Sequence, residues 1–156
     1  MRRRKAAPYG GPLSAAIPIA WRLRAIVAAA IIPPLLEIVS FPRLERLLRS
    51  AARVSITRAP DDSAAAWWVD RCLSRLPAPW KRTCLRRAAV LYYLLRSSGR
   101  AVNLCIGVRR DEHGELLAHA WLVRDGSIYV EPTSTSEVVS EYTLIALFPD
   151  TTAHGA

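Results

Sequence analysis

The chain has 156 residues, of which 51% are hydrophobic, and a formal net charge of +9. This length predicts one domain, with or without an extension, and the apolar content is enough for a single core. Three cysteines without a Cys-x-x-Cys pair or a Cys/His ladder argue against a disulfide framework and a structural metal site, and they favour a reducing, cytoplasmic location.

Charge is unevenly distributed along the chain. Residues 1–100 hold 19 Lys and Arg against 5 Asp and Glu, whereas residues 101–156 hold 3 against 8. A basic half predicts an acidic partner, such as a peptide, another protein, nucleic acid or anionic lipid. The sequence contains no helix-turn-helix, zinc-module or RNA-binding aromatic pattern. Charge is then the only feature that supports a nucleic-acid partner, so we expect no such partner.

An apolar stretch near the N-terminus predicts a helix over residues 15–32 that stops at Pro33-Pro34. Its longest uncharged run has 12 residues, whereas a helix that spans a membrane needs about 20. We therefore expect a buried helix, or a peripheral membrane contact through residues 15–41.

Two amphipathic helices are expected next. The first covers residues 43–58 and has a basic outer face, formed by Arg46, Arg49 and Arg53. The second begins at the acidic start signal of residues 60–63. Its apolar positions recur at helical spacing, which makes the cysteine among them a core residue: Ala65, Trp68, Val69, Cys72, Leu73 and Leu76.

A helix that is apolar on most sides follows, from Cys84 to Ser98, and Gly99 is a suitable residue to end it. The hydrophobic period then changes to two, which predicts strands over residues 102–108, 116–123 and 127–131; residues 137–148 could add a helical or extended segment. The expected fold is α+β, with N-terminal helices and a central helix packed on a three-stranded antiparallel meander.

Cys84 is the candidate nucleophile. A thiol attacks only as thiolate, and the positive end of a helix dipole stabilises an anion. Thr83 is a plausible N-cap, which puts Cys84 in the first helical turn, where backbone N–H groups can also bind an oxyanion. Arg86 and Arg87 add positive charge nearby. The alternative is that Cys84 is one more core cysteine.

His119 is the candidate base, and Glu131 is the acid that we expect to orient it. His119 shares a strand face with Trp121, and a buried polar ring needs a partner. That partner could instead be a backbone carbonyl, in which case the histidine is structural. Asp125 is the second candidate acid, although an aspartate in a turn commonly serves the turn itself.

The turn between the last two strands decides whether Glu131 can reach His119. A two-residue loop, Asp125-Gly126, would turn Glu131 to the face away from His119. A three-residue loop that also includes Arg124, closed by a left-handed Gly126, puts Glu131 directly opposite His119. We predict the second register, because a glycine at the third loop position suits that bulge.

The order of these motifs resembles the transglutaminase-like branch of the papain-type cysteine enzymes: a cysteine at a helix start, then a strand, a strand with histidine and a strand with an acid. More narrowly, it resembles the stand-alone leader peptidases, or B proteins, of lasso-peptide biosynthesis. The segments that carry this resemblance are Cys84-Leu85-Arg86-Arg87-Ala88, Ile106-Gly107-Val108-Arg109-Arg110, Gly114-Glu115-Leu116-Leu117-Ala118-His119-Ala120-Trp121 and Asp125-Gly126.

The resemblance implies a cysteine peptidase that removes the leader from a ribosomally made precursor peptide. Cys84 would be the nucleophile, His119 the base and then acid, and Glu131 the acid of the triad, where many relatives have Asp. No cofactor or metal is implied. The implied partners are the precursor peptide, a separate leader-recognition protein and an ATP-dependent cyclase resembling asparagine synthetase, which joins the freed amine to an acidic side chain.

Two other hypotheses compete with a peptidase: an acyl or amide transferase on the same scaffold, and a non-catalytic interaction protein whose triad residues belong to the core.

If the protein is a peptidase, we expect the chain to divide into a disordered basic tail (1–14), an apolar helical segment (15–42), a transglutaminase-like cysteine peptidase domain (43–148) and a disordered tail (149–156).

Overall fold

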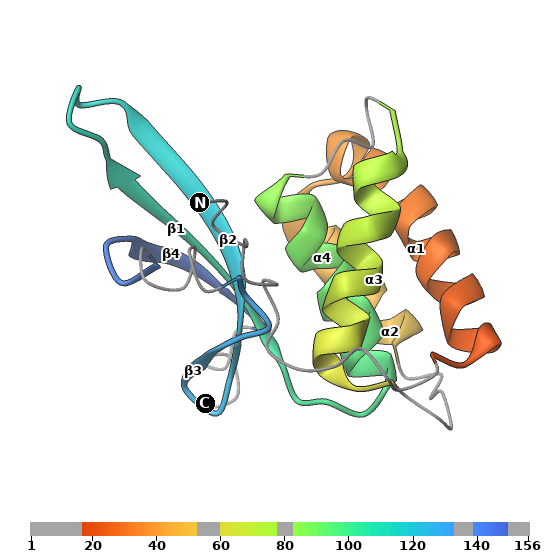
Figure 1. The fold of residues 1–156 in the computed structure, drawn as a ribbon. Helices are drawn as coiled ribbons and strands as arrows, with labels where there is room; N and C mark the ends of the chain where they lie inside the picture. Colours follow the sequence, from red (N-terminus) through yellow and green to blue (C-terminus); the bar gives the residue numbers. More distant parts are fainter. Residues whose placement is uncertain (1–16, 53–59, 78–82, 133–138, 150–156) are drawn as a thin grey trace, which may run out of the picture.

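The structure is a computed structural model, and it describes residues 17–52, 60–77, 83–132 and 139–149. Figure 1 shows a layer of helices on one side and an antiparallel sheet on the other, which confirms the α+β class. The helices are α1 (Ile19–Ile38), α2 (Phe41–Ala51), α3 (Asp62–Arg75) and α4 (Cys84–Ser97). The strands are β1 (Asn103–Arg110), β2 (Leu116–Arg124), β3 (Ser127–Tyr129) and β4 (Thr143–Phe148), in the spatial order β3-β2-β1-β4.

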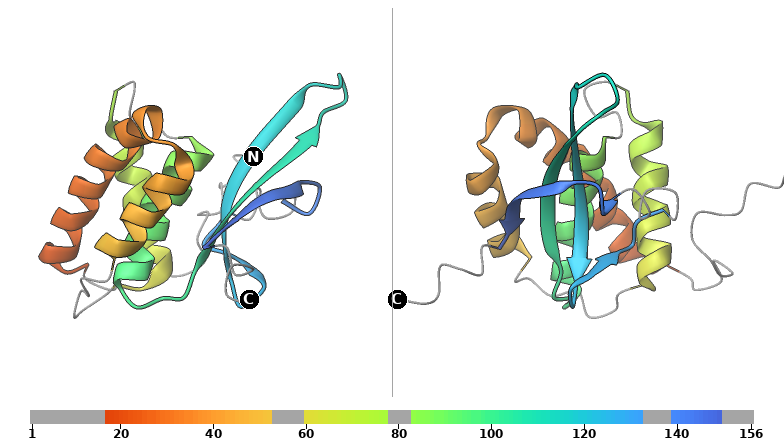
Figure 2. Two further views of the ribbon diagram at one scale, coloured as in Figure 1. Left: turned by 180° about the vertical axis from the view of Figure 1, so that it is seen from behind. Right: turned by 90° about the vertical axis from the view of Figure 1, so that its left-hand side faces the viewer.

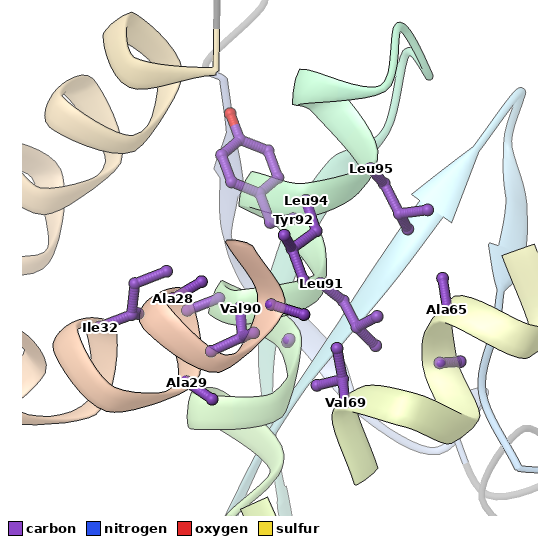
Figure 3. Close-up of a cluster of buried hydrophobic side chains, with 14 of the residues drawn as sticks. Ala28, Ala29, Ile32, Ala65, Val69, Val90, Leu91, Tyr92, Leu94 and Leu95 are labelled. Carbon is purple, nitrogen blue, oxygen red and sulfur yellow. The ribbon is translucent and has the colours of Figure 1, made fainter. Parts of the chain in front are cut away.

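The central helix is α4, which lies between the sheet and the other helices (Figure 1 and the left view of Figure 2). Its middle is buried on nearly every side, as its apolar sequence predicts. Figure 3 shows Val90 and Leu91 of α4 meeting Ala29 of α1 and Val69 of α3. The inner face of the sheet closes the same core with Leu104, Ala120 and Leu122.

The predicted end of the first helix at Pro33-Pro34 is wrong, because α1 continues through both prolines to Ile38. Pro33 itself is buried, and the Val39 N–H donates to the Leu35 carbonyl at 2.9 Å to close the helix beyond the prolines. Burial of this helix against α4 outweighs the local cost of proline, since tertiary packing overrides propensity.

By length and composition alone, α1 could cross a membrane, and 33% of its most apolar stretch is buried inside the protein. Both a core helix and an N-terminal signal sequence pass the same test. The outward side of α1 keeps several large apolar side chains in solvent, among them Ile19, Leu23, Val27 and Ile31. A peripheral membrane contact stays a prediction.

The two amphipathic helices form where the sequence places them, with differences at their edges. In α2, Leu44 and Leu48 are buried, whereas Leu47 is 57% exposed. The remainder of that predicted helix, with Arg53, lies outside the described residues. The helix α3 starts at its predicted signal, where the Asp61 carboxylate accepts from the N–H groups of Ser63 and Ala64.

The sheet has a fourth strand beyond the expected meander. Of the segment that we expected to be helical or extended, residues 143–148 are extended, and they form β4, which pairs antiparallel with β1. The third strand is shorter than predicted, because it ends at Tyr129 rather than residue 131. The predicted tail over 1–14 lies outside the described residues, as does the tail over 149–156 except for Pro149.

Candidate active site

Cys84 is the first residue of α4, as the sequence predicts. Thr83 caps the helix, because its Oγ1 accepts a hydrogen bond from the Arg86 N–H at 3.3 Å and its carbonyl accepts from the Arg87 N–H at 3.0 Å. The thiol is half-buried, and Sγ lies 4.0 Å from the carbonyl oxygen of Ala118. The start of the central helix therefore brings the sulfur against the backbone of β2 at Ala118, the residue that precedes His119 in the sequence.

His119 lies in the middle of β2, and its ring is enclosed by aromatic side chains. The imidazole stacks on Trp121 at 5.9 Å and lies 5.5 Å from the Tyr142 ring. Its Nε2 is buried and has no hydrogen-bond partner among the described residues. Burial lowers the pKa of His119, and the positive charge of Arg87 lowers it further. The ring is therefore kept in the neutral form, which can accept a proton.

Gly107 provides the space for this aromatic packing. It pairs with His119 across the β1–β2 ladder, and a Cβ on it would lie 2.7 Å from the Trp121 ring. Trp121 therefore covers the glycine and stacks beside the imidazole. Sequence reasoning missed the roles of Gly107 and Tyr142; the available signal was a glycine inside a strand, which marks a close approach of another group.

The predicted register of the last hairpin is wrong. Arg124 pairs with Ser127, so the loop has two residues, Asp125 and Gly126, with φ of 50° and 77°. Two successive left-handed residues form the turn that matches the twist of a hairpin, and aspartate tolerates that conformation. Glu131 is therefore not the cross-strand partner of His119.

Glu131 nevertheless reaches the site by another route. The chain leaves β3 at Val130, which has φ of 51°, and the Glu131 carboxylate is buried in an ion pair with Arg87, whose Nη1 lies 2.8 Å from Oε1. One pocket of about 160 Å³ brings the three predicted site residues together. Its lining residues are Thr83, Cys84, Arg87, His119, Ala120, Glu131 and Pro132.

Asp125, the second candidate acid, is not among the residues that line this pocket. Its side chain is 87% exposed in the turn, where its Oδ2 lies 3.5 Å from Nε of the neighbouring Arg124. Of the two acids proposed from the sequence, Glu131 is the one in the pocket.

The other two cysteines have a different character. Burial raises the pKa of Cys72, and it raises the pKa of Cys105 to about 11. Both thiols are therefore poor nucleophiles near neutral pH. Within the described residues, no group of three or more His, Cys, Asp and Glu side chains could hold a metal ion.

One family model matches most of the chain. It describes the transglutaminase-like superfamily and covers residues 15–146, a span that includes Cys84, His119 and Glu131. The match begins ahead of α1, and this helix shares the core of α4. Comparisons with curated proteins and with solved structures gave no match.

Proposed function

Since this chain belongs to the transglutaminase-like superfamily, whose members are generally enzymes of the cysteine peptidase or transferase type, we propose that it is a cysteine peptidase. Cys84, His119 and Glu131 are the proposed catalytic groups. The single observation that carries the proposal is the shared pocket, because three residues from separate parts of the chain line it together. A thiol, an imidazole and a carboxylate are the groups that nucleophilic acyl transfer requires.

The first half of the proposed reaction cleaves the peptide bond. The neutral His119 imidazole accepts the Cys84 proton as Sγ attacks the scissile carbonyl carbon, and a tetrahedral oxyanion forms. The N–H groups in the first turn of a helix lack intrahelical partners, so the start of α4 can donate to that oxyanion. The oxyanion then collapses to a thioester while the imidazolium gives its proton to the leaving amine.

The second half releases the acid. The amine product leaves, and His119 takes a proton from a water molecule that attacks the thioester carbonyl. The intermediate collapses, the C–S bond breaks, and the proton returns to Sγ. An amine in place of water would give a transferase, which is the alternative on the same scaffold; the two outcomes differ in whether the released acyl product is a free acid or an amide.

The finer proposal is that the substrate is the leader region of a ribosomally made precursor peptide in lasso-peptide maturation. Its support is the sequence likeness of four segments, of which the first begins at Cys84 and the last is Asp125-Gly126. The proposed product is a core peptide with a free amine, which a separate ATP-dependent cyclase would join to an acidic side chain. The cytoplasmic location stays a prediction from the cysteine content.

A leader-recognition protein is the proposed partner, and the groove between α1 and α2 is its proposed docking surface. The groove is open and lined mainly by apolar residues, including the exposed side chains of Val27, Ile31 and Leu47. Arg24 lies in it, and Arg46 is exposed on α2. An apolar surface beside arginines fits a partner that presents apolar and acidic side chains together.

The test is cleavage of a precursor peptide by the wild-type chain, with the recognition protein present, followed by mass spectrometry. We expect free leader and core from wild type, and no cleavage by Cys84→Ala or His119→Ala. Cys72→Ala is the matched control, because it removes a half-buried thiol outside the pocket and should retain activity. Full activity of Cys84→Ala would reject the peptidase; an amide product would favour the transferase.

A further inference from the structure

Arg87 joins three parts of the fold with one guanidinium group. Its Nε donates to the Asp70 carboxylate of α3 at 2.8 Å. Its Nη1 donates to the Glu131 carboxylate at 2.8 Å, and its Nη2 donates to the Val130 carbonyl oxygen at 2.7 Å. The arginine side chain is only 6% exposed, so these are buried, charge-assisted hydrogen bonds.

One of those bonds holds an unusual piece of backbone. Val130 has φ of 51°, a left-handed conformation in which a β-branched residue is a genuine outlier. Such strain persists only where the surroundings hold it, and it gathers at functional sites. Here the bond from Arg87 fixes the carbonyl of the strained residue, and the next residue is Glu131. The strain therefore lies where the chain turns from β3 toward the pocket.

We propose that Arg87 is a positioning residue, which holds Val130 in its left-handed conformation and so fixes the Glu131 carboxylate in the pocket that His119 also lines. The inference rests on the proposed triad. Arg87 lies three residues after Cys84, so the same turn of α4 carries the nucleophile and the group that places the acid. Asp70 binds the guanidinium at Nε, while Glu131 and the Val130 carbonyl bind its two Nη atoms, and together these bonds fix its direction.

The shape of arginine matters as much as its charge. A guanidinium presents several donors in one rigid plane, and Arg87 uses three of its nitrogens on three different acceptors. A lysine ammonium would keep the positive charge, but it is a point donor on a flexible stem and cannot reproduce the arrangement. Arg87→Lys therefore separates the positioning of Glu131 from the electrostatic effect on His119.

The charged and titratable groups around the imidazole are few enough to interpret a pH profile. Arg87 approaches from α4 and Glu131 from the end of β3, and both line the pocket with His119. Tyr142 faces the imidazole from the segment before β4, and its ring lies under the Arg109 guanidinium at 5.3 Å. Arg87→Lys leaves the charge of every one of these groups unchanged.

The experiment measures the pH dependence of Cys84 alkylation by iodoacetamide, with the modified residue identified by mass spectrometry. This experiment needs no peptide substrate. A failure to cleave the precursor peptide would therefore reject the proposed function without affecting the test of Arg87. Cys72 and Cys105 react slowly near neutral pH because burial raises their pKa values. The variants are Arg87→Lys, Glu131→Gln and the double variant, with Arg86→Lys as the control.

If Arg87 acts through Glu131, both single variants raise the midpoint of the alkylation profile by a similar amount, about one pH unit, because His119 then accepts the thiol proton less readily. The double variant shifts no further, since groups that act as a unit are not additive. Arg86, which pairs with Glu37 away from the pocket, should give the wild-type profile when changed to lysine.

Three outcomes overturn the proposal: a wild-type profile for Arg87→Lys, a double-variant shift equal to the sum of the single shifts, or an equal shift in Arg86→Lys. Circular dichroism checks that each variant is folded. If Arg87→Lys does not fold, the comparison is repeated in an Asp70→Asn background, where the ammonium has one fewer buried carboxylate to neutralise.

Discussion

Gly107 and His119 are paired across the β1–β2 ladder, and the indole of Trp121 lies over the glycine and beside the imidazole. Because Gly107 has no side chain, the Trp121 indole has room to stack on the imidazole of His119, the candidate base. This relationship links the packing of the outer sheet face, where Trp121 meets Cys105 and Val139, to the geometry of the pocket.

Gly107→Ala should destabilise the protein, because the added methyl group would lie 2.7 Å from Trp121 and 3.0 Å from the Thr143 carbonyl oxygen. We expect a loss of about 1–3 kcal/mol in the free energy of unfolding, as is usual for overpacking. Urea denaturation measures it. Trp121→Leu is the background that tests the cause: if the indole is the obstacle, Gly107→Ala costs less there, and an unchanged cost would contradict this account.

The features that the sequence predicts correctly around Cys84 are local ones. A Thr N-cap, a thiol in the first turn and Gly99 past the last turn are all set by residues next to one another. The amphipathic period of α3 is of the same kind: it predicts Cys72 as a core residue, and the thiol is partly buried against the core. Short-range spacing is enough to predict such elements.

The features that the sequence predicts wrongly depend on contacts between residues far apart in the chain, or on a choice between two conformations of similar free energy. The choice between two hairpin loops turned on whether Asp125 would adopt a left-handed conformation, and both loops fit an Asp-Gly sequence. Proline signals at 33 and 34 were outweighed by burial of α1 against α4. The sequence predicts Arg87 only as a positive charge near Cys84, whereas the structure buries it in ion pairs with Asp70 and Glu131. An arginine inside an apolar helix indicates such a buried ion pair.

Thr83→Ala should loosen the start of α4. The Thr83 hydroxyl accepts from the Arg86 N–H at 3.3 Å, and loss of an N-cap costs about 1 kcal/mol. We expect this loss in thermal or urea unfolding, whereas Thr83→Ser should retain most of the stability because serine caps equally well. Equal destabilisation by alanine and serine would show that the methyl group, rather than the cap, is what matters.

Acid should destabilise the protein partly through His119. Burial lowers the pKa of His119 below its ordinary 6.5, so as the pH falls the unfolded chain takes up this proton before the folded one. The stability from the neutral ring is complete above pH 6.5 and is lost as the pH falls toward the lowered, folded-state pKa. Urea unfolding at several pH values between 7.5 and 5 measures the loss.

A variant pair assigns that loss to the correct histidine. His119→Gln should flatten the decline in unfolding free energy below pH 6.5, because the titrating group is gone. His113→Gln is the matched control: His113 is exposed in the turn between β1 and β2, and its removal should leave the decline as in wild type. The assignment is wrong if the two variants behave alike.

The groove between α1 and α2 gives the last prediction. Ile31→Glu and Leu47→Glu each place a carboxylate on an exposed apolar position of the groove, where it would meet the apolar side of a partner. We expect at least a tenfold loss of affinity for the recognition protein, which corresponds to about 1.4 kcal/mol. Calorimetry measures the affinity, and alkylation of Cys84 checks that the pocket is intact.

Leu116→Glu is the control for this prediction. Leu116 is 63% exposed at the start of β2, and it does not line the groove, so the variant adds the same charge elsewhere and should bind as wild type does. An equal loss in Leu116→Glu would point to net charge rather than the groove. The remaining possibility is a membrane contact through the exposed side of α1, and sedimentation with vesicles of anionic phospholipid tests it. If the groove variants lose vesicle binding but still bind the recognition protein, that side of α1 faces a membrane instead.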